Sequence, residues 1–274
     1  MRTGQFETVS EIRLSLNEMW FLLEQYSPTT IAGIENPYMG WLAEEVEPVQ
    51  REALRSLVDR DQVRMIADDE IALEESVAAL VGVCAHADHS LIVKWRHGEN
   101  ELQTYAHFGN DLIVEVAEVE PGVYNLTACE NATASSQSLA GALRSHSSTS
   151  SEGDSFQLSE GLLDSARLLC QEGKTDEAKS ILKVGTKLKG EEISRLVKVL
   201  SAPVASSSFI LIANRNNPDA QYVSGFAVLE GQDEMWLMQV HEQNGKPIVT
   251  FNPANANMVL EHFLEIMPVG YRER

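Results

Sequence analysis

The residues whose types are best suited to chemistry lie close together in the run Cys84-Ala-His86-Ala-Asp88-His89. One thiolate and two imidazoles are ordinary zinc ligands, and a fourth ligand would complete a tetrahedral site. The spacing matches no standard zinc motif, and no fourth ligand is apparent. We therefore interpret Cys84 as a small buried hydrophobic residue, and His86 and His89 as exposed loop residues.

Two acidic runs, Glu44-Glu45 and Asp68-Asp69-Glu70, could supply paired carboxylates for acid–base chemistry. Acidic surface and the first turn of a helix favour the same residues without any catalysis. The sequence contains no phosphate-binding glycine loop and no G-x-S-x-G, H-E-x-x-H or C-x-x-C motif. We expect no catalytic residue, no metal ligand and no cofactor. A site without a local motif stays open, because triads are recognised by geometry.

Composition narrows the classes of partner. The chain has 274 residues and a net charge of -20, which disfavours nucleic acid and anionic membranes as partners. Its three cysteines are an odd number without a disulfide pattern, so we expect reduced thiols. The N-terminus lacks a signal peptide pattern, and no apolar run reaches the ~18 residues that span a bilayer. These features predict a cytoplasmic protein.

The acidic charge is uneven along the chain. Residues 1–90 hold six Arg, no Lys and seventeen Asp or Glu. A solvated surface explains this distribution, and an interaction face for a basic partner is the alternative.

The elements that must position these residues begin with a helix. Ser15 and Glu18 form a capping box before a run of apolar residues at helical spacing. Pro48 is interpreted as the start of a second helix, and a third is predicted from about Glu70 to Cys84. Four strands with short turns follow, near residues 91–96, 102–108, 112–116 and 123–129, which is typical of an antiparallel meander.

The same order returns after a serine-rich segment. Helices are predicted from Ser159, Thr175 and Glu191, and a last helix follows Asn255. Between the helix from Glu191 and the last helix, strands are predicted at residues 209–213, 222–229, 235–240 and 247–251. We expect a first α+β repeat at residues 1–132, a partly disordered linker at 133–157 and a second repeat at 158–274.

The repeat predicts the fold class. It is α+β, with two pseudo-repeated units that each contain helices and a four-stranded antiparallel meander, related by a pseudo-two-fold axis. Apolar positions of the helix before each meander align at an offset of 116 residues, which grows at the turns. The pattern leaves open whether the two sheets join edge to edge or pack face to face.

Several short stretches carry a likeness to a known family. They are Leu16-Asn17-Glu18-Met19-Trp20, Glu52 to Val58, Pro121-Gly122-Val123-Tyr124, Gly161-Leu162-Leu163-Asp164 and Val249 to Ala254. In this order and at these intervals, the chain resembles the EspG family of ESX (type VII) secretion-associated proteins. The resemblance implies a fold of two related halves.

The resemblance also implies a function. Members of that family are cytosolic chaperones that bind a tip of PPE proteins within PE–PPE heterodimers and cover an apolar surface before export. Here the partner would be a helical secretion substrate. A strand-connecting loop of the first half and helices of the second half would contact it. In this chain that loop would be His97, Gly98, Glu99 and Asn100.

Two other classes of function remain as alternatives. A small-ligand-binding protein or enzyme would use a pocket between the halves, lined by converging polar groups. A structural homo-oligomer, such as a homo-dimer, would pair sheet edges between chains.

Overall fold

The computed structural model describes residues 11–26, 33–67, 70–109, 112–129, 154–217 and 219–268. In the first half the elements are β1 (Glu11–Ser15), α1 (Leu16–Glu24), α2 (Ala43–Asp59), β2 (Val63–Ala67), β3 (Glu70–Leu73), α3 (Glu75–His86), β4 (His89–His97), β5 (Asn100–Phe108), β6 (Ile113–Glu120) and β7 (Val123–Cys129). In the second half they are β8 (Phe156–Ser159), α6 (Glu160–Gln171), α7 (Thr175–Gly185), α8 (Gly190–Ser201), β9 (Ala205–Ala213), β10 (Tyr222–Glu230), β11 (Met235–Gln243), β12 (Lys246–Pro253) and α9 (Ala256–Ile266).

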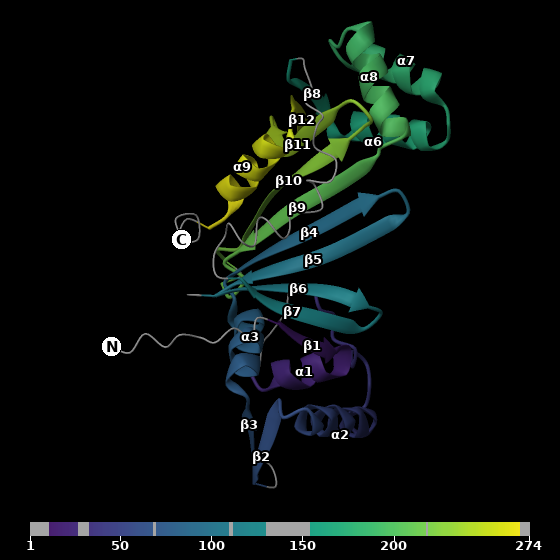
Figure 1. Cartoon of the computed structure of the whole chain (residues 1–274). Coiled ribbons are helices and arrows are strands. Elements are labelled where there is room, and N and C mark those ends of the chain that lie inside the picture. The colour runs from purple at the N-terminus through teal and green to yellow at the C-terminus, as the bar shows by residue number, and fades with distance from the viewer. Residues whose placement is uncertain are drawn as a thin grey trace.

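One large antiparallel sheet organises the molecule (Figure 1). It has ten strands in the order β1-β7-β6-β5-β4-β9-β10-β11-β12-β8, and β2 and β3 form a separate two-stranded sheet. β4 pairs with β9, from Ser90 opposite Ile212 to His97 opposite Ala205. The two meanders therefore join edge to edge. The fold is mixed α+β, as expected. The sequence analysis missed β1 and β8, which add one strand to each end of the large sheet, and it missed the β2–β3 pair of the first half.

Both groups of three helices lie on one face of the sheet, called here the front face. A core cluster joins α1 and α3 to Tyr105 of β5, and another joins α6–α8 to Leu229 of β10. Tyr105 pairs with Ile92, which pairs in turn with Ile210 of β9. Leu229 pairs with Ser206 of β9, whose side chain lies on the same face of the strand as that of Ile210. Because directly paired residues share a face, both helix groups cover the same side.

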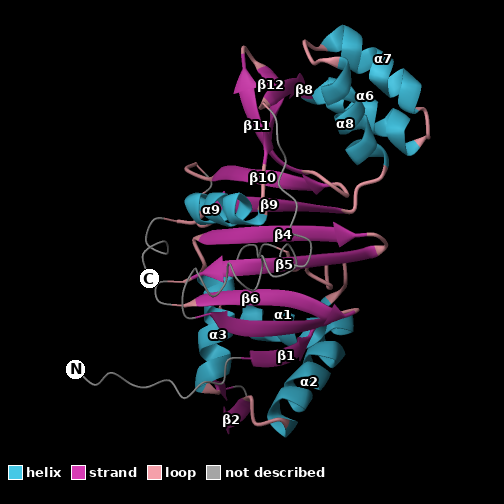
Figure 2. Cartoon of the chain, turned by 45° about the horizontal axis from the view of Figure 1, so that its top comes forward, coloured by secondary structure: helices cyan, strands magenta, loops and turns pink. Residues whose placement is uncertain are grey.

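The opposite, back face carries α9. Val259 and Phe263 of α9 pack against Phe209 and Leu211 of β9. These two strand residues alternate with Ile210, which points to the front. Figure 2 shows α9 against the central strands, with α1 and α3 on the other side of the sheet.

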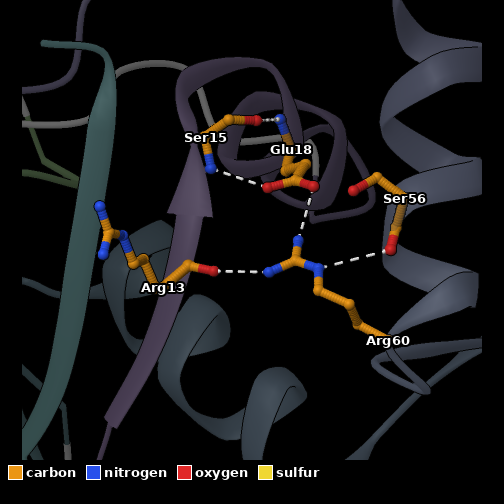
Figure 3. A network of polar contacts seen from close by, with 5 residues as sticks. All are labelled: Arg13, Ser15, Glu18, Ser56 and Arg60. Atoms are coloured by element: carbon orange, nitrogen blue, oxygen red, sulfur yellow. Dashed lines mark hydrogen bonds and ion pairs between the residues drawn. The ribbon is translucent and has the colours of Figure 1, made fainter. Parts of the chain in front are cut away.

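The first helix begins where the capping box predicts. The backbone N–H of Ser15 donates to Glu18 Oε2 at 2.7 Å, and the backbone N–H of Glu18 donates to Ser15 Oγ at 3.3 Å. Arg60, just after α2, completes the network in Figure 3. Its Nη2 lies 2.5 Å from Glu18 Oε1, and its Nη1 donates to the backbone oxygen of Arg13 at 2.9 Å.

Glu18 is a buried carboxylate whose charge is supported from several sides. Burial alone would raise its pKa. Hydrogen bonds from Ser56 and the Ser15 N–H, with the charge of Arg60, hold the pKa of Glu18 below its ordinary value instead. The residues of the helix cap thus also form the hydrogen bonds and the ion pair that connect β1, α1 and the end of α2.

Two predicted boundaries were wrong. The second helix begins at Ala43 rather than at Pro48, which lies inside it and leaves one helical hydrogen bond unmade. The third helix begins at Glu75, and Glu70–Leu73 is a strand. Glu74 caps this helix by accepting from the backbone N–H of Ser76 at 2.9 Å, so the acidic residue that marks the helix start is Glu74 rather than Glu70.

Most of the expected serine-rich linker lies outside the described residues, which resume at Asp154. β8 then runs across the expected boundary at residues 157 and 158, because it pairs with β12 through Phe156 opposite Phe251 and Leu158 opposite Val249. No helix in the described parts of the chain is long and apolar enough to cross a bilayer.

Candidate functional site

The predicted binding loop is the tip of a long hairpin. His97 pairs with Asn100, so Gly98 and Glu99 form the turn between β4 and β5. Gly98 has φ +58°, a conformation that a residue without a Cβ adopts at little cost. Trp95 stacks on His97 with ring centroids 5.7 Å apart, and this contact stiffens the hairpin just below its tip.

Strand pairing brings this tip to the second half of the chain. His97 lies opposite Ala205, the first residue of β9, and α8 ends four residues earlier at Ser201. The end of α8 and the hairpin tip therefore lie at the same end of the β4–β9 pair. The structure thus places a first-half hairpin tip near the end of a second-half helix, and the role of this tip in binding stays a prediction.

A partly exposed strip runs from the tip along β4 and β9, between the two helix groups of the front face. We call it the central strip, and it consists of the front-facing residues Ile92, Lys94, Arg96, Ser206, Ser208, Ile210 and Ile212. The three isoleucines are half-buried, and Lys94 and Arg96 are exposed. The strip therefore combines apolar area with positive charge, although the whole chain is strongly acidic.

The charged end of the strip is pre-arranged. Arg96 Nη2 donates to Glu101 Oε2 at 2.9 Å across the hairpin. The hydrogen bond and the charge of Arg96, with the charge of Lys94, hold the pKa of Glu101 below its ordinary value. Both partners are exposed, so this ion pair orients the side chains more than it stabilises the fold.

Sequence reasoning missed the strip because half of it looks unlike a strand. The run Ala205-Ser206-Ser207-Ser208 has weak strand propensity, and the predicted strand began only at Phe209. The register with β4 extends the strand by four residues and places Ser206 and Ser208 on the front face. The apolar run from Phe209 to Ala213 was the available signal, and it marks only the second half of the strand.

At the other end of the β4–β9 pair lies a buried polar cluster. Ser90 Oγ lies 2.9 Å from His107 Nδ1, and Arg215 Nη1 donates to Ser90 Oγ at 2.7 Å. Since Ser90 Oγ accepts from Arg215, its hydroxyl is left to donate to Nδ1. Burial and then the charge of Arg215 lower the pKa of His107 to about 3, so the ring is neutral.

This cluster has the residue types of a nucleophile and base but not their access. Ser90 and His107 are fully buried, so no substrate could reach the hydroxyl. Arg215 also donates its backbone N–H to the oxygen of Asp88 at 2.8 Å. The cluster fastens the β9–β10 connection of the second half to β4 and β5 of the first.

The fold places the residues of the run from Cys84 to His89 in different surroundings. Cys84 is buried, and burial raises the pKa of its thiol to about 12. His86 packs edge-on against Tyr26 at a centroid distance of 5.5 Å, and His89 lies 3.7 Å from Asp88. In the described ranges, no three or more His, Cys, Asp or Glu side chains are grouped to hold a metal ion.

Comparison with known proteins gives matches among solved structures alone. No family model matches the chain, and a search of curated proteins finds no match. Among solved structures, the chain is similar to the Mycobacterium tuberculosis type VII secretion system chaperone EspG5, solved in complex with the PE25–PPE41 dimer. The TM-score is 0.68 at 15% identity, over 95% of this chain and 98% of that one. This similarity establishes an EspG-like fold.

Proposed function

We propose that this protein is a cytoplasmic, non-catalytic chaperone-like protein that binds a helical protein substrate of a type VII (ESX-like) secretion system. The observation that carries the proposal is the fold match over nearly the whole chain with a chaperone solved together with a protein dimer. A shared fold does not by itself fix a partner. The surface of this chain supplies the second support.

The central strip and the hairpin tip have properties suited to a helical partner. The strip is two strands wide, roughly 10 Å, which is about the diameter of one helix. Ile92, Ile210 and Ile212 offer apolar contact, and Lys94 offers charge. The helix groups on both sides would limit how a partner enters. His97, Gly98, Glu99 and Asn100 would then contact the partner at the open end of the strip.

We also propose that the two halves arose by duplication. The order strand, three helices and four-stranded meander occurs once before residue 130 and once after residue 153, with the β2–β3 pair inserted between the second and third helices of the first half. The sheet order is the same when read inward from either edge. The partner would thus sit where the two copies of the unit meet.

The test is a pull-down from native host lysate with three versions of the full chain. One is the wild type, and one carries Lys94→Glu and Glu99→Lys at the strip and tip. The matched control carries Glu242→Lys and Lys246→Glu on the β11–β12 hairpin, which has the same short turn elsewhere in the sheet.

The proposal expects helical secretion substrates to be enriched by the wild type and the control, and recovery to fall about ten-fold with the strip variant. Binding is then repeated with the purified substrate by calorimetry. Recovery of the bait alone, as a dimer on sizing, would contradict the proposal. Equal recovery by the strip variant would contradict the assigned surface.

A further inference from the structure

β8 is the outermost strand at one end of the ten-stranded sheet, and among the described strands it pairs only with β12. Phe156 and Leu158 point into the core of the second half, whereas Gln157 and Ser159 are exposed. An outermost strand presents backbone N–H and C=O groups on its outer side, and an added strand can pair with them.

A groove of about 820 Å³ lies beside this strand. One wall is formed by residues 154–157 and the other by residues 184–189, with Glu192 and Thr250 completing the lining. Val184 belongs to the second wall and is 89% exposed, the highest exposure among the large apolar side chains of the described residues. The groove therefore offers an apolar contact next to a row of backbone hydrogen-bonding groups.

The second wall is held firmly in place. Gly185 lies so close to α6 that a Cβ there would come within 2.6 Å of Leu162. Thr186 Oγ1 donates to the backbone oxygen of Leu182 at 2.7 Å and accepts from the N–H of Leu188 at 3.2 Å. The groove is thus formed before any ligand arrives, which lowers the entropic cost of binding.

Lysines are concentrated in the segment that contains this wall. Six of the eight lysines of the chain lie between residues 174 and 198. Lys174, Lys179 and Lys198 make ion pairs with acidic neighbours. Lys187 and Lys189, which line the groove, make no ion pair with any described residue, and both are exposed.

Two acidic residues also line the groove, but they leave these ammonium groups available. Glu192 Oε2 accepts from the backbone N–H of Lys189 at 2.6 Å and so caps α8. Asp154 lies two residues before β8, at the start of the first wall. The groove therefore favours a ligand that brings carboxylates toward Lys187 and Lys189.

The opposite edge of the sheet, at β1, is protected by contacts that the described residues do not make at β8. On β1, Arg60 Nη1 donates to the backbone oxygen of Arg13, so one acceptor of the edge strand is already used. Arg13 also pairs with Glu120 at 2.6 Å, and Glu11 accepts from Asn125. Charged side chains and an occupied backbone acceptor discourage strand addition at β1.

We infer that the β8 edge is a second binding site, which takes an extended peptide segment with alternating apolar and acidic side chains by strand addition. Its backbone would pair with residues 156–159, its apolar side chains would contact Val184, and its carboxylates would meet Lys187 and Lys189. This site goes beyond the proposed chaperone surface, which lies at the centre of the sheet.

An acidic segment of another protein fits this site better than a second copy of the chain. Two copies carry -20 charges each and repel one another at long range. The β8 strand itself is uncharged, Phe-Gln-Leu-Ser, and would bring no carboxylate to the two lysines.

The test uses a fluorescein-labelled peptide of four Val-Glu repeats, with a Val-Lys peptide of equal length as the probe control. Fluorescence anisotropy with the full chain is expected to give a Kd of roughly 10–100 μM for the Val-Glu peptide and at least about ten-fold weaker binding for the Val-Lys peptide. Lys187→Glu with Lys189→Glu should weaken binding about five-fold or more. The matched variant, Lys174→Glu with Lys179→Glu, changes lysines outside the groove and should leave the Kd within about two-fold.

Hydrogen–deuterium exchange locates the peptide. Slower exchange at residues 156–159 on adding the Val-Glu peptide supports strand addition. The inference is overturned if the peptide does not bind, if both lysine pairs affect binding equally, or if protection appears elsewhere. It is also overturned if sedimentation shows that β8 is covered by a second copy. The outcome is separate from the proposed function, because the groove variant should still recover the helical substrate.

Discussion

At one end of the sheet β1 is followed by α1–α3, and at the other end β8 is followed by α6–α8. The first end has a buried ionic network in which Glu18 and Arg60 join a strand, a helix cap and the end of α2. The second end is joined by apolar packing, with Phe156 stacked on Phe251 at 4.9 Å and edge-on to Trp236. Both ends pack an apolar core, and the first end adds a polar network that also protects its edge strand.

The largest expected effect concerns the apolar end. Phe251 is fully buried between Phe156 and Trp236, so Phe251→Ala should lower the free energy of unfolding by about 3–5 kcal/mol. Urea denaturation measures the change. Val184→Ala, at an exposed position of the same end, should change it by less than about 0.5 kcal/mol. A loss below about 1 kcal/mol for Phe251→Ala would mean that apolar packing does not dominate there.

The next effect concerns the ionic network. Arg60→Ala leaves the buried Glu18 carboxylate without its cation and should cost about 2–3 kcal/mol in urea denaturation. Arg51→Ala is the control, because Arg51 makes an exposed pair with Glu47 on the same helix and should cost less than about 0.5 kcal/mol. Adding Glu18→Gln to Arg60→Ala should recover part of the loss. An additive double variant would show that the two side chains are not coupled.

Two buried carboxyl groups, one in each half, should contribute to the stability of the protein with opposite dependence on pH. The pKa of Glu18 is lowered, so its contribution is present above its unfolded pKa and is lost as pH falls through the folded value. Burial raises the pKa of Glu230 to about 7, so stability is lost as pH rises from about 4.5 to about 7.

Glu230→Gln should therefore stabilise the protein by about 1–2 kcal/mol at pH 8 and by little at pH 4.5. Glu18→Gln should destabilise it at pH 7, by an amount that shrinks as pH falls below about 4.5. Both variants are followed by urea denaturation from pH 4 to pH 8. Parallel profiles for the two variants would contradict this contrast.

The smallest effect on stability, and a test of edge protection, comes from β1. Glu11→Val with Arg13→Val removes two exposed charged side chains and should change the free energy of unfolding by less than about 1 kcal/mol. The uncharged edge should self-associate, which sedimentation velocity would detect as a concentration-dependent dimer. A chain that stays monomeric would show that Arg60, bound to the backbone of Arg13, is sufficient protection.

Local patterns predicted the elements that have local causes. The Ser15–Glu18 capping box fixed the start of α1, and Val123–Cys129 was predicted as a strand with its observed bounds. β1 and β8 were missed because they have only five and four residues and exist through pairing with strands about ninety or more residues away. Short strands carry too little periodicity to be recognised alone.

The candidate site divides in the same way. His97–Asn100 could be predicted as a turn from Gly98 and the flanking strands, and its role in binding remains a prediction. Its neighbours on β9 could not be predicted, because Ser206 and Ser208 have weak strand propensity and only pairing with β4 aligns them. The groove beside β8 depends on an equally distant contact, between an edge strand and the α7–α8 connection.

The sequence by itself determined the α+β class, most helices and strands, the acidic charge and the concentration of lysines between residues 174 and 198. These follow from spacing, capping and composition, which act over a few residues. Only the tertiary structure decided that the meanders join through β4 and β9, that both helix groups share one face and that β8 is the outermost strand of the second half. Backbone pairing is available to any strand, so the choice of neighbour depends on which faces the whole chain must bury.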